Sequence, residues 1–199
     1  MTRIKICGLT RQRDIDFVNE AGPDYVGFVF AESRRRVDAN QASVLRKRLA
    51  AGIQAVGVFV DAPGEQILDI CRRGIIDWVQ LHGNEDPAYI AELRRNTDKP
   101  LIKAVSMSRP FDPGKLKMLD VDYFLFDQGS GGSGRTFDWS RIPQLGKPFF
   151  LAGGLGPDNL NQAVRRVRPF AVDLSSGVET DGVKDREKIL EAVRSVRNE

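Results

Sequence analysis

The stretch FFLAGGLGPDN, residues 149–159, runs from an apolar segment through glycines into a polar turn. Its first part, FFLAGG at 149–154, is short and apolar, which is typical of a buried strand. Residues 158–167 follow at once and are amphipathic, so they predict a helix that starts from Asp158. A strand followed directly by a helix is half of a βαβ unit, and the recurrence of this unit decides the fold.

The same kind of apolar run recurs along the whole chain. Many of the runs are apolar nearly throughout rather than alternating, as expected for parallel strands that are covered on both faces. Together with 149–154 the candidates number eight: IKIC (4–7), YVGFVF (25–30), AVGVFV (55–60), WVQL (78–81), LIKAV (101–105), YFLFD (123–127) and AVDLSSG (171–177) are the others.

Amphipathic stretches between most of these runs predict helices. Besides 158–167 they cover residues 11–21 (with Thr10 as the N-cap), 40–50, 64–73, 87–95 and 185–197. The Pro-rich segment after the fifth run, SMSRPFDPGKLKML, predicts a short helix at most. Eight strand–helix units predict an α/β fold, a single (β/α)₈ TIM barrel over residues 1–199 with a reduced helix after strand five. The main alternative is an open doubly wound sheet, which usually has five or six strands.

Composition limits the function classes. The chain has 199 residues, of which 41% are hydrophobic and 29% charged, as in one soluble domain with a sizeable core. Two cysteines make no disulfide framework, and one histidine excludes a His-rich site. Neither a signal peptide nor a membrane span is predicted, so we expect a cytoplasmic location and no membrane partner. The net charge of +3 is spread out, which argues against a nucleic-acid partner and suits an enzyme for an anionic metabolite.

The active site of a (β/α)₈ barrel lies at the carboxyl ends of its strands. Cys7 ends the first predicted strand, and the run Ser33-Arg34-Arg35-Arg36 follows the second. His82 follows the fourth strand, Asp127 ends the sixth, and Asp173 lies near the end of the eighth. We therefore expect a thiol, a guanidinium, an imidazole and two carboxylates to meet at one mouth.

Each of these residues also has a structural interpretation. Cys7 is either a small core residue or a reactive thiol, because free cysteines are often buried and inert. Asp127 is either a loop or helix-cap residue or a general acid, and we favour the acid. His82 either hydrogen-bonds a neighbour or stabilises a loop. Cys71, on the apolar face of a predicted helix, is interpreted as packing.

Two glycine motifs predict an anion site. LAGGLG follows strand seven and DLSSGVE follows strand eight, where this fold commonly binds phosphate. Backbone N–H groups approach an anion closely where glycine replaces a side chain. The candidates are Gly153, Gly154, Ser176 and Gly177, although ordinary turns would give the same motifs.

The loop GSGGSGRTFDW after strand six suits either a flap over a substrate or a flexible surface loop. The arginine run suits a carboxylate clamp or a solvated edge.

Taken together, the motifs resemble those of the phosphoribosylanthranilate isomerases. The matching segments follow in order along essentially the whole chain: KICG, GFVFAESRRRV, VGVFV, VQLHG, FD with GGSG and FDW, FFLAGGL, DLSSGVE and GVKD. The resemblance implies a single (β/α)₈ barrel of tryptophan biosynthesis. It implies the Amadori rearrangement of N-(5-phosphoribosyl)anthranilate to 1-(2-carboxyphenylamino)-1-deoxyribulose 5-phosphate, without cofactor or metal.

The resemblance also implies roles for individual residues. Cys7 matches the general base and Asp127 the general acid. Arg35 matches the arginine that holds the anthranilate carboxylate, with Arg36 as the reserve candidate because the arginine run leaves the register uncertain by one. The residues of the glycine motifs would bind the phosphate, and His82 and Asp173 would line the substrate site. The base must be a thiolate when it acts, so either its pKa is lowered or its proton is passed on in the complex.

Other functions compete with this one. Phosphate-binding barrel isomerases of the histidine-pathway or dual-substrate type carry an aspartate where this chain has Cys7. Indole-glycerol-phosphate synthases use a catalytic lysine and a longer chain. A barrel that binds a phosphorylated ligand without catalysis would not need the pairing of Cys7 with Asp127. Both monomers and homodimers remain open for the assembly.

Overall fold

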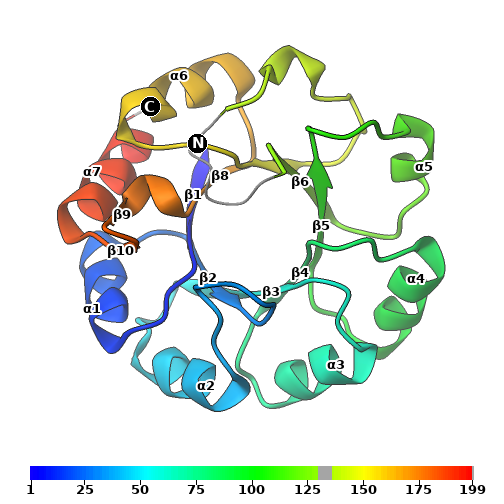
Figure 1. The fold of residues 1–199 in the computed structure, drawn as a ribbon, viewed down its shortest axis with the longest axis horizontal. Helices are drawn as coiled ribbons and strands as arrows, with labels where there is room; N and C mark the ends of the chain where they lie inside the picture. Colours follow the sequence, from blue (N-terminus) through cyan, green and yellow to red (C-terminus); the bar gives the residue numbers. More distant parts are fainter. Residues whose placement is uncertain (130–135, 199) are drawn as a thin grey trace.

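A closed ring of parallel strands forms the centre of the molecule, with helices around it (Figure 1). The computed structural model describes residues 1–129 and 136–198. Each strand pairs in parallel with the next, and β8 pairs back onto β1 to close the ring. In the described residues the ring has eight strands: β1 Arg3–Cys7, β2 Tyr25–Val29, β3 Gln54–Phe59, β4 Trp78–Leu81, β5 Leu101–Ser106, β6 Tyr123–Asp127, β7 Phe149–Leu151 and β8 Ala171–Leu174. The predicted (β/α)₈ barrel is confirmed, and the open sheet is wrong.

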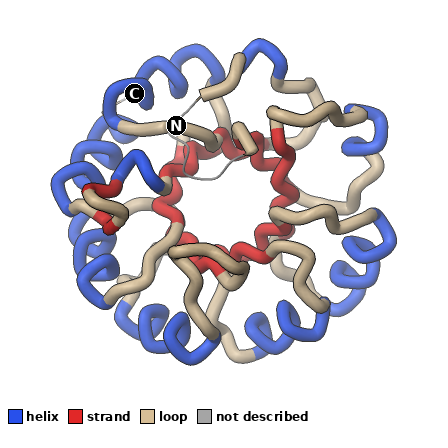
Figure 2. Tube along the Cα trace, in the orientation of Figure 1, coloured by secondary structure: helices blue, strands red, loops and turns tan. Residues whose placement is uncertain are grey.

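Helices cover the outside of this ring (Figure 2). They are α1 Gln12–Ala21, α2 Ala39–Arg48, α3 Gly64–Arg72, α4 Pro87–Asn96, α5 Pro113–Lys117, α6 Pro157–Val167 and α7 Arg186–Arg197. The reduced helix after the fifth strand is confirmed, because α5 has five residues. Between β6 and β7 the described residues hold only a 3₁₀ turn, Trp139–Arg141. None of the described helices is long and apolar enough to cross a membrane.

Two predicted helix starts are wrong. Arg11, rather than Thr10, is the N-cap of α1, because the buried Asp14 carboxylate accepts hydrogen bonds from the backbone N–H groups of both residues. Helix α6 begins at Pro157 with Gly156 as its N-cap. Proline suits the first helical position because the N–H that it lacks would have no partner there.

A hairpin that the sequence analysis did not predict lies between β8 and α7. It follows a short 3₁₀ turn, Ser176–Val178, and pairs β9 Glu179–Thr180 with β10 Val183–Lys184 in antiparallel fashion. The hairpin brings Glu179 and Lys184 close to the mouth of the barrel, where both are buried.

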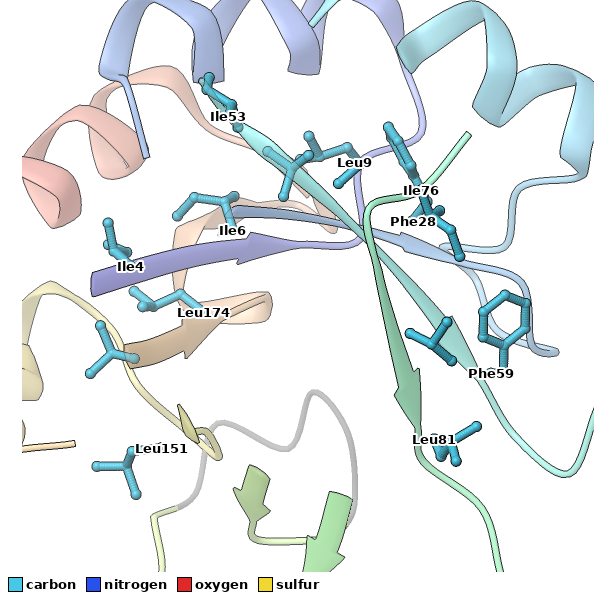
Figure 3. Close-up of a cluster of buried hydrophobic side chains, with 14 of the residues drawn as sticks. Ile4, Ile6, Leu9, Phe28, Ile53, Phe59, Ile76, Leu81, Leu151 and Leu174 are labelled. Carbon is cyan, nitrogen blue, oxygen red and sulfur yellow. The ribbon is translucent and has the colours of Figure 1, made fainter. Parts of the chain in front are cut away.

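Side chains alternate between two faces along each strand. On β1, Ile4 and Ile6 belong to the apolar layer between the ring and the helices, where Leu174 and Leu151 also pack (Figure 3). Lys5, between these two isoleucines, belongs to the opposite face, inside the barrel. The interior of the barrel therefore holds a different set of side chains from the apolar layer between the ring and the helices.

Aromatic rings fill the barrel interior at the end where the strands begin. Tyr25 packs edge-on against Trp78 at 5.1 Å and against Phe150 at 5.5 Å between ring centroids. Tyr123 and Phe170 pack against this group at 4.7 Å from each other. Edge-to-face contacts of this kind stabilise beyond simple burial. Among the described residues, the barrel interior is thus filled by side chains at the end where the strands begin.

Candidate active site

A cavity of about 380 Å³ lies at the carboxyl ends of the strands. Its size is in the range of small-molecule sites. It is lined by every residue predicted for the site except Gly177: Cys7, Arg35, His82, Asp127, Gly153, Gly154, Asp173 and Ser176. Gly177 lines an adjoining hollow together with Gly154 and Ser176. The topology of the barrel therefore brings together residues that are up to about 170 positions apart in sequence.

Cys7 is the last residue of β1 and is 8% exposed. It pairs in register with Gly27 of β2. A Cβ atom on Gly27 would lie 2.5 Å from the Cys7 sulfur, so only glycine leaves room for the thiol there. The sequence analysis missed Gly27, although a glycine inside an apolar strand is a known signal of a close approach.

Two buried lysines, Lys5 and Lys184, lie near Cys7. Lys5 precedes it by two residues on the same face of β1, and its Nζ donates to Asp173 Oδ2 at 2.9 Å. Burial is the largest single influence on the pKa of Lys5 and lowers it, but the charges and hydrogen bonds of Asp173 and Cys7 together raise the pKa above its ordinary value. Lys184 donates to Glu179 Oε1 at 2.7 Å and to the carbonyl of Ser175 at 2.9 Å.

The pKa of the Cys7 thiol is raised above its ordinary value. Burial raises the pKa, Lys5 lowers it, the Asp173 carboxylate raises it, and Lys184 lowers it. Burial prevails because a thiolate loses its hydration in this position. A raised pKa favours the thiol form of Cys7 in the free protein at neutral pH.

Arg35 is held by an acidic residue that the sequence analysis did not identify. Its Nε and Nη2 donate to the two carboxylate oxygens of Glu179 at 2.6 and 2.8 Å. A Cβ on Gly8 would lie 2.4 Å from Arg35 Cδ, so Gly8 leaves room for this arginine. Arg36 instead pairs with Glu32, and both side chains are more than half exposed. Of the two candidate arginines, Arg35 is the one that lines the cavity.

Asp127 ends β6 and is 8% exposed. Its Oδ2 lies 3.5 Å from Nε2 of His82. On its other side, a Cβ on Gly153 would lie 3.0 Å from Oδ1. The Nδ1 of His82 lies 3.0 Å from Nε2 of Gln80, which also lines the cavity. The carboxyl group therefore lies between an imidazole and a glycine.

The two glycine motifs meet where the sequence analysis placed the phosphate. Gly153 and Gly154 have φ angles of +88° and +64°, a conformation that favours glycine. A Cβ on Gly177 would lie 2.0 Å from the carbonyl oxygen of Leu155, so the turns after β7 and β8 pack backbone against backbone. Turns of this kind present backbone N–H groups to an anion. Of the predicted flap after β6, residues 130–135 lie outside the described residues.

A model of the family described as N-(5'-phosphoribosyl)anthranilate (PRA) isomerase matches residues 4–195. The chain belongs to this family. The N-(5'-phosphoribosyl)anthranilate isomerase of Endomicrobium trichonymphae is 48% identical, with all of both chains covered. The solved phosphoribosylanthranilate isomerase of Thermotoga maritima is 37% identical, with a TM-score of 0.88 and all of both chains covered.

A further solved member of the family carries a ligand. It is 34% identical over all of both chains with a TM-score of 0.82, and it was solved in complex with reduced 1-(o-carboxyphenylamino)-1-deoxyribulose 5-phosphate. The present chain is thus an enzyme, an isomerase of tryptophan biosynthesis, and the resemblance of its motifs is confirmed at the level of the family.

Proposed function

We propose that this chain catalyses the Amadori rearrangement of N-(5-phosphoribosyl)anthranilate to 1-(2-carboxyphenylamino)-1-deoxyribulose 5-phosphate. The observation that carries the proposal is one cavity lined by a thiol, a carboxyl group, a guanidinium and glycine turns. Membership of the family and the ligand bound to its solved relative support the same substrate class. The ligand is a phosphorylated small molecule, and the proposal includes a cytoplasmic location and neither nucleic acid nor membrane as partner.

The two anionic ends of the substrate fit two parts of the cavity. The turns of Gly153, Gly154, Ser176 and Gly177 bind the phosphate through backbone N–H groups. Arg35 binds the anthranilate carboxylate: Glu179 occupies Nε and one N–H of Nη2, and the edge formed by Nη1 and Nη2 can still hold a second carboxylate. Substrate held at both ends has its ribose ring between Cys7 and Asp127.

Asp127 acts first, as the general acid. It gives its proton to the ring oxygen of the furanose while the bond from that oxygen to C1′ breaks. The lone pair of the anthranilate nitrogen forms a double bond to C1′, which gives an open-chain iminium ion. His82 and Gly153 flank the carboxyl group and hold it in place.

Cys7 acts second, as the general base. The positive iminium acidifies the C2′ proton, and the same charge beside the thiol lowers its pKa in the complex. The thiol gives up its S–H proton to solvent at the mouth of the cavity. The Cys7 thiolate then takes the C2′ proton, and the electron pair of the C–H bond neutralises the iminium to give an enolamine. Tautomerisation of the enolamine to the ketone completes the reaction. The positive charge of the iminium therefore has two effects. It lowers the pKa of Cys7, and it is neutralised when Cys7 removes the C2′ proton.

Turnover of N-(5-phosphoribosyl)anthranilate tests the proposal, because anthranilate derivatives fluoresce and loss of substrate is followed directly. We expect saturable loss of substrate fluorescence with wild-type protein and essentially none with a Cys7→Ala, Asp127→Asn double variant. A wild-type protein that binds the substrate without converting it would show a ligand-binding barrel instead, and the proposal would fail.

A further inference from the structure

We propose that Lys5 and Gln80 are positioning residues that fix the neutral His82 ring as its Nε2–H tautomer. His82 then donates to Oδ2 of Asp127, and the proton that Asp127 delivers is carried on Oδ1. The first part stands on the contacts of the free protein alone. The second part rests on the proposed function, because it takes Asp127 as the general acid.

The chain of contacts begins with the buried ammonium of Lys5. This side chain is 0% exposed, and its Nζ lies 3.0 Å from Oε1 of Gln80. An ammonium group can only donate hydrogen bonds, so the atom of Gln80 that faces it must be the carbonyl oxygen. A flipped amide would place two donors face to face between two side chains that are almost fully buried. Leaving buried donors unpaired is energetically costly. Lys5 therefore fixes the orientation of the Gln80 amide.

The amide in turn fixes the ring. With its oxygen toward Lys5, Gln80 presents its NH₂ group to His82, and Nε2 of Gln80 lies 3.0 Å from Nδ1 of the ring. Gln80 is 1% exposed, so this NH₂ group has no solvent as an alternative partner. A donor facing Nδ1 requires that Nδ1 accept, and the proton of the neutral ring must then be on Nε2.

The ring tautomer determines what Asp127 can do. Nε2 of His82 lies 3.5 Å from Oδ2 of Asp127, a separation that contacts at catalytic sites often shorten once substrate is bound. A protonated Nε2 donates to Oδ2, so the acidic proton is carried on Oδ1, the oxygen next to Gly153. An unprotonated Nε2 would accept that proton and divert it from the substrate. The chain of contacts from Lys5 through Gln80 to His82 prevents this diversion.

The tautomer of His82 can be measured without overlap from other imidazoles, because His82 is the only histidine in the sequence. A ¹⁵N–¹H correlation spectrum of the imidazole nitrogens is recorded on uniformly ¹⁵N-labelled protein, at a pH at which the ring is neutral. It shows the signals of one imidazole ring. We expect Nε2 protonated and Nδ1 unprotonated in the free wild-type protein. A protonated Nδ1 in the neutral ring would overturn the proposal. Because no substrate is present, the result is independent of whether the chain turns over phosphoribosylanthranilate.

Substitutions separate Gln80 from Asp127 as the cause of the tautomer. Gln80→Glu keeps the size of the side chain and its contact with Lys5 but presents only acceptors, so we expect Nδ1 to become protonated. An unprotonated Nδ1 in this variant would contradict the proposal. Asp127→Ala removes the acceptor at Nε2 and should leave the Nε2–H tautomer in place. A mixture of tautomers there would assign the control to Asp127 instead.

Lys5→Met tests the first link, with Lys184→Met as a matched loss of a buried lysine that does not contact Gln80. We expect mixed tautomers only in Lys5→Met, and pure Nε2–H in this variant would remove Lys5 from the chain of contacts.

Gln80→Glu should also lower kcat about 10- to 100-fold with little change in KM, since only part of the general-acid effect is lost. An unchanged kcat would refute the second part, and circular dichroism shows which variants fold.

Discussion

The two sides of the mouth are built differently. Cys7, on the side of β1 and β8, lies among buried charges that come from Lys5, Asp173 and Lys184. Asp127, on the side of β4 and β6, contacts one imidazole that is itself oriented by hydrogen bonds. The pKa of the thiol is therefore set by burial and by these charges, whereas the carboxyl group faces a single imidazole. In the proposed mechanism the base must ionise during the reaction and the acid must direct its proton, and the two sides suit these different needs.

The largest effects are expected from removing either reactive group. Cys7→Ala and Asp127→Asn should each lower kcat about 100- to 10,000-fold, the range of general acid–base catalysis. Cys71→Ala, on the apolar face of α3, is the control and should turn over normally, since Cys71 lies outside the cavity. Near-normal turnover in either site variant would remove that residue from the mechanism.

The next effect concerns the stability of the charged side. Glu179 is 4% exposed in its side chain and contacts Arg35, Arg34 and Lys184. Glu179→Gln should lower the free energy of unfolding by about 3–5 kcal/mol, because the buried Lys184 and the partly buried Arg35 lose their charged partner. The exposed pair of Glu32 with Arg36 is the control, and Glu32→Gln should cost about 0–1 kcal/mol. Urea unfolding measures both, and equal costs would mean that Glu179 does not organise this side.

A smaller effect separates the two candidate arginines. Arg35→Lys should raise KM for phosphoribosylanthranilate about 10- to 100-fold, the loss of a charge-assisted hydrogen bond, because lysine does not reproduce the planar contact. Arg36→Lys, on the exposed pair, should leave KM unchanged. Steady-state kinetics decide between them. A KM increase confined to Arg36→Lys would transfer the role to Arg36.

The smallest effect is a shift in the titration of the thiol. Since the pKa of Cys7 is raised, its alkylation by iodoacetamide in a Cys71→Ala background should increase with pH around a midpoint above the ordinary thiol value. Lys184 lowers the pKa of Cys7, so Lys184→Met should move the midpoint further up. Lys47→Met, at an exposed position of α2, should not move it. A wild-type midpoint below the ordinary value would contradict the raised pKa of the thiol.

Local patterns were sufficient to predict the barrel. Each strand is an apolar run, and the order of strands and helices follows the chain, so the predicted fold needed no contact between distant residues. The strand ends then placed Cys7 and Asp127 at one mouth. Helix starts were less predictable: Asp14 satisfies the first N–H groups of α1 from within the helix, which a search for a capping residue before the helix overlooks.

Local sequence patterns did not predict the residues that support the cavity-lining side chains. Glu179 is on the hairpin of β9 and β10, whose short strands carry no apolar run, and only burial against three cations reveals it. Lys5 and Gln80 are 75 positions apart and meet only because β1 and β4 face the same interior. Alternation along a strand did contain a signal, because Lys5 shares a face with Cys7 and Gln80 shares one with His82.

The isotope effect of C2′-deuterated substrate tests the division of labour between the two sides most directly. If Asp127 opens the ring before Cys7 takes the C2′ proton, Asp127→Asn should make ring opening limiting and suppress the deuterium isotope effect on kcat. Cys7→Ser, whose hydroxyl is scarcely ionised at neutral pH, should make C–H cleavage limiting and give a large primary isotope effect. The reverse pattern, a large effect in Asp127→Asn and none in Cys7→Ser, would contradict the assignment of acid and base.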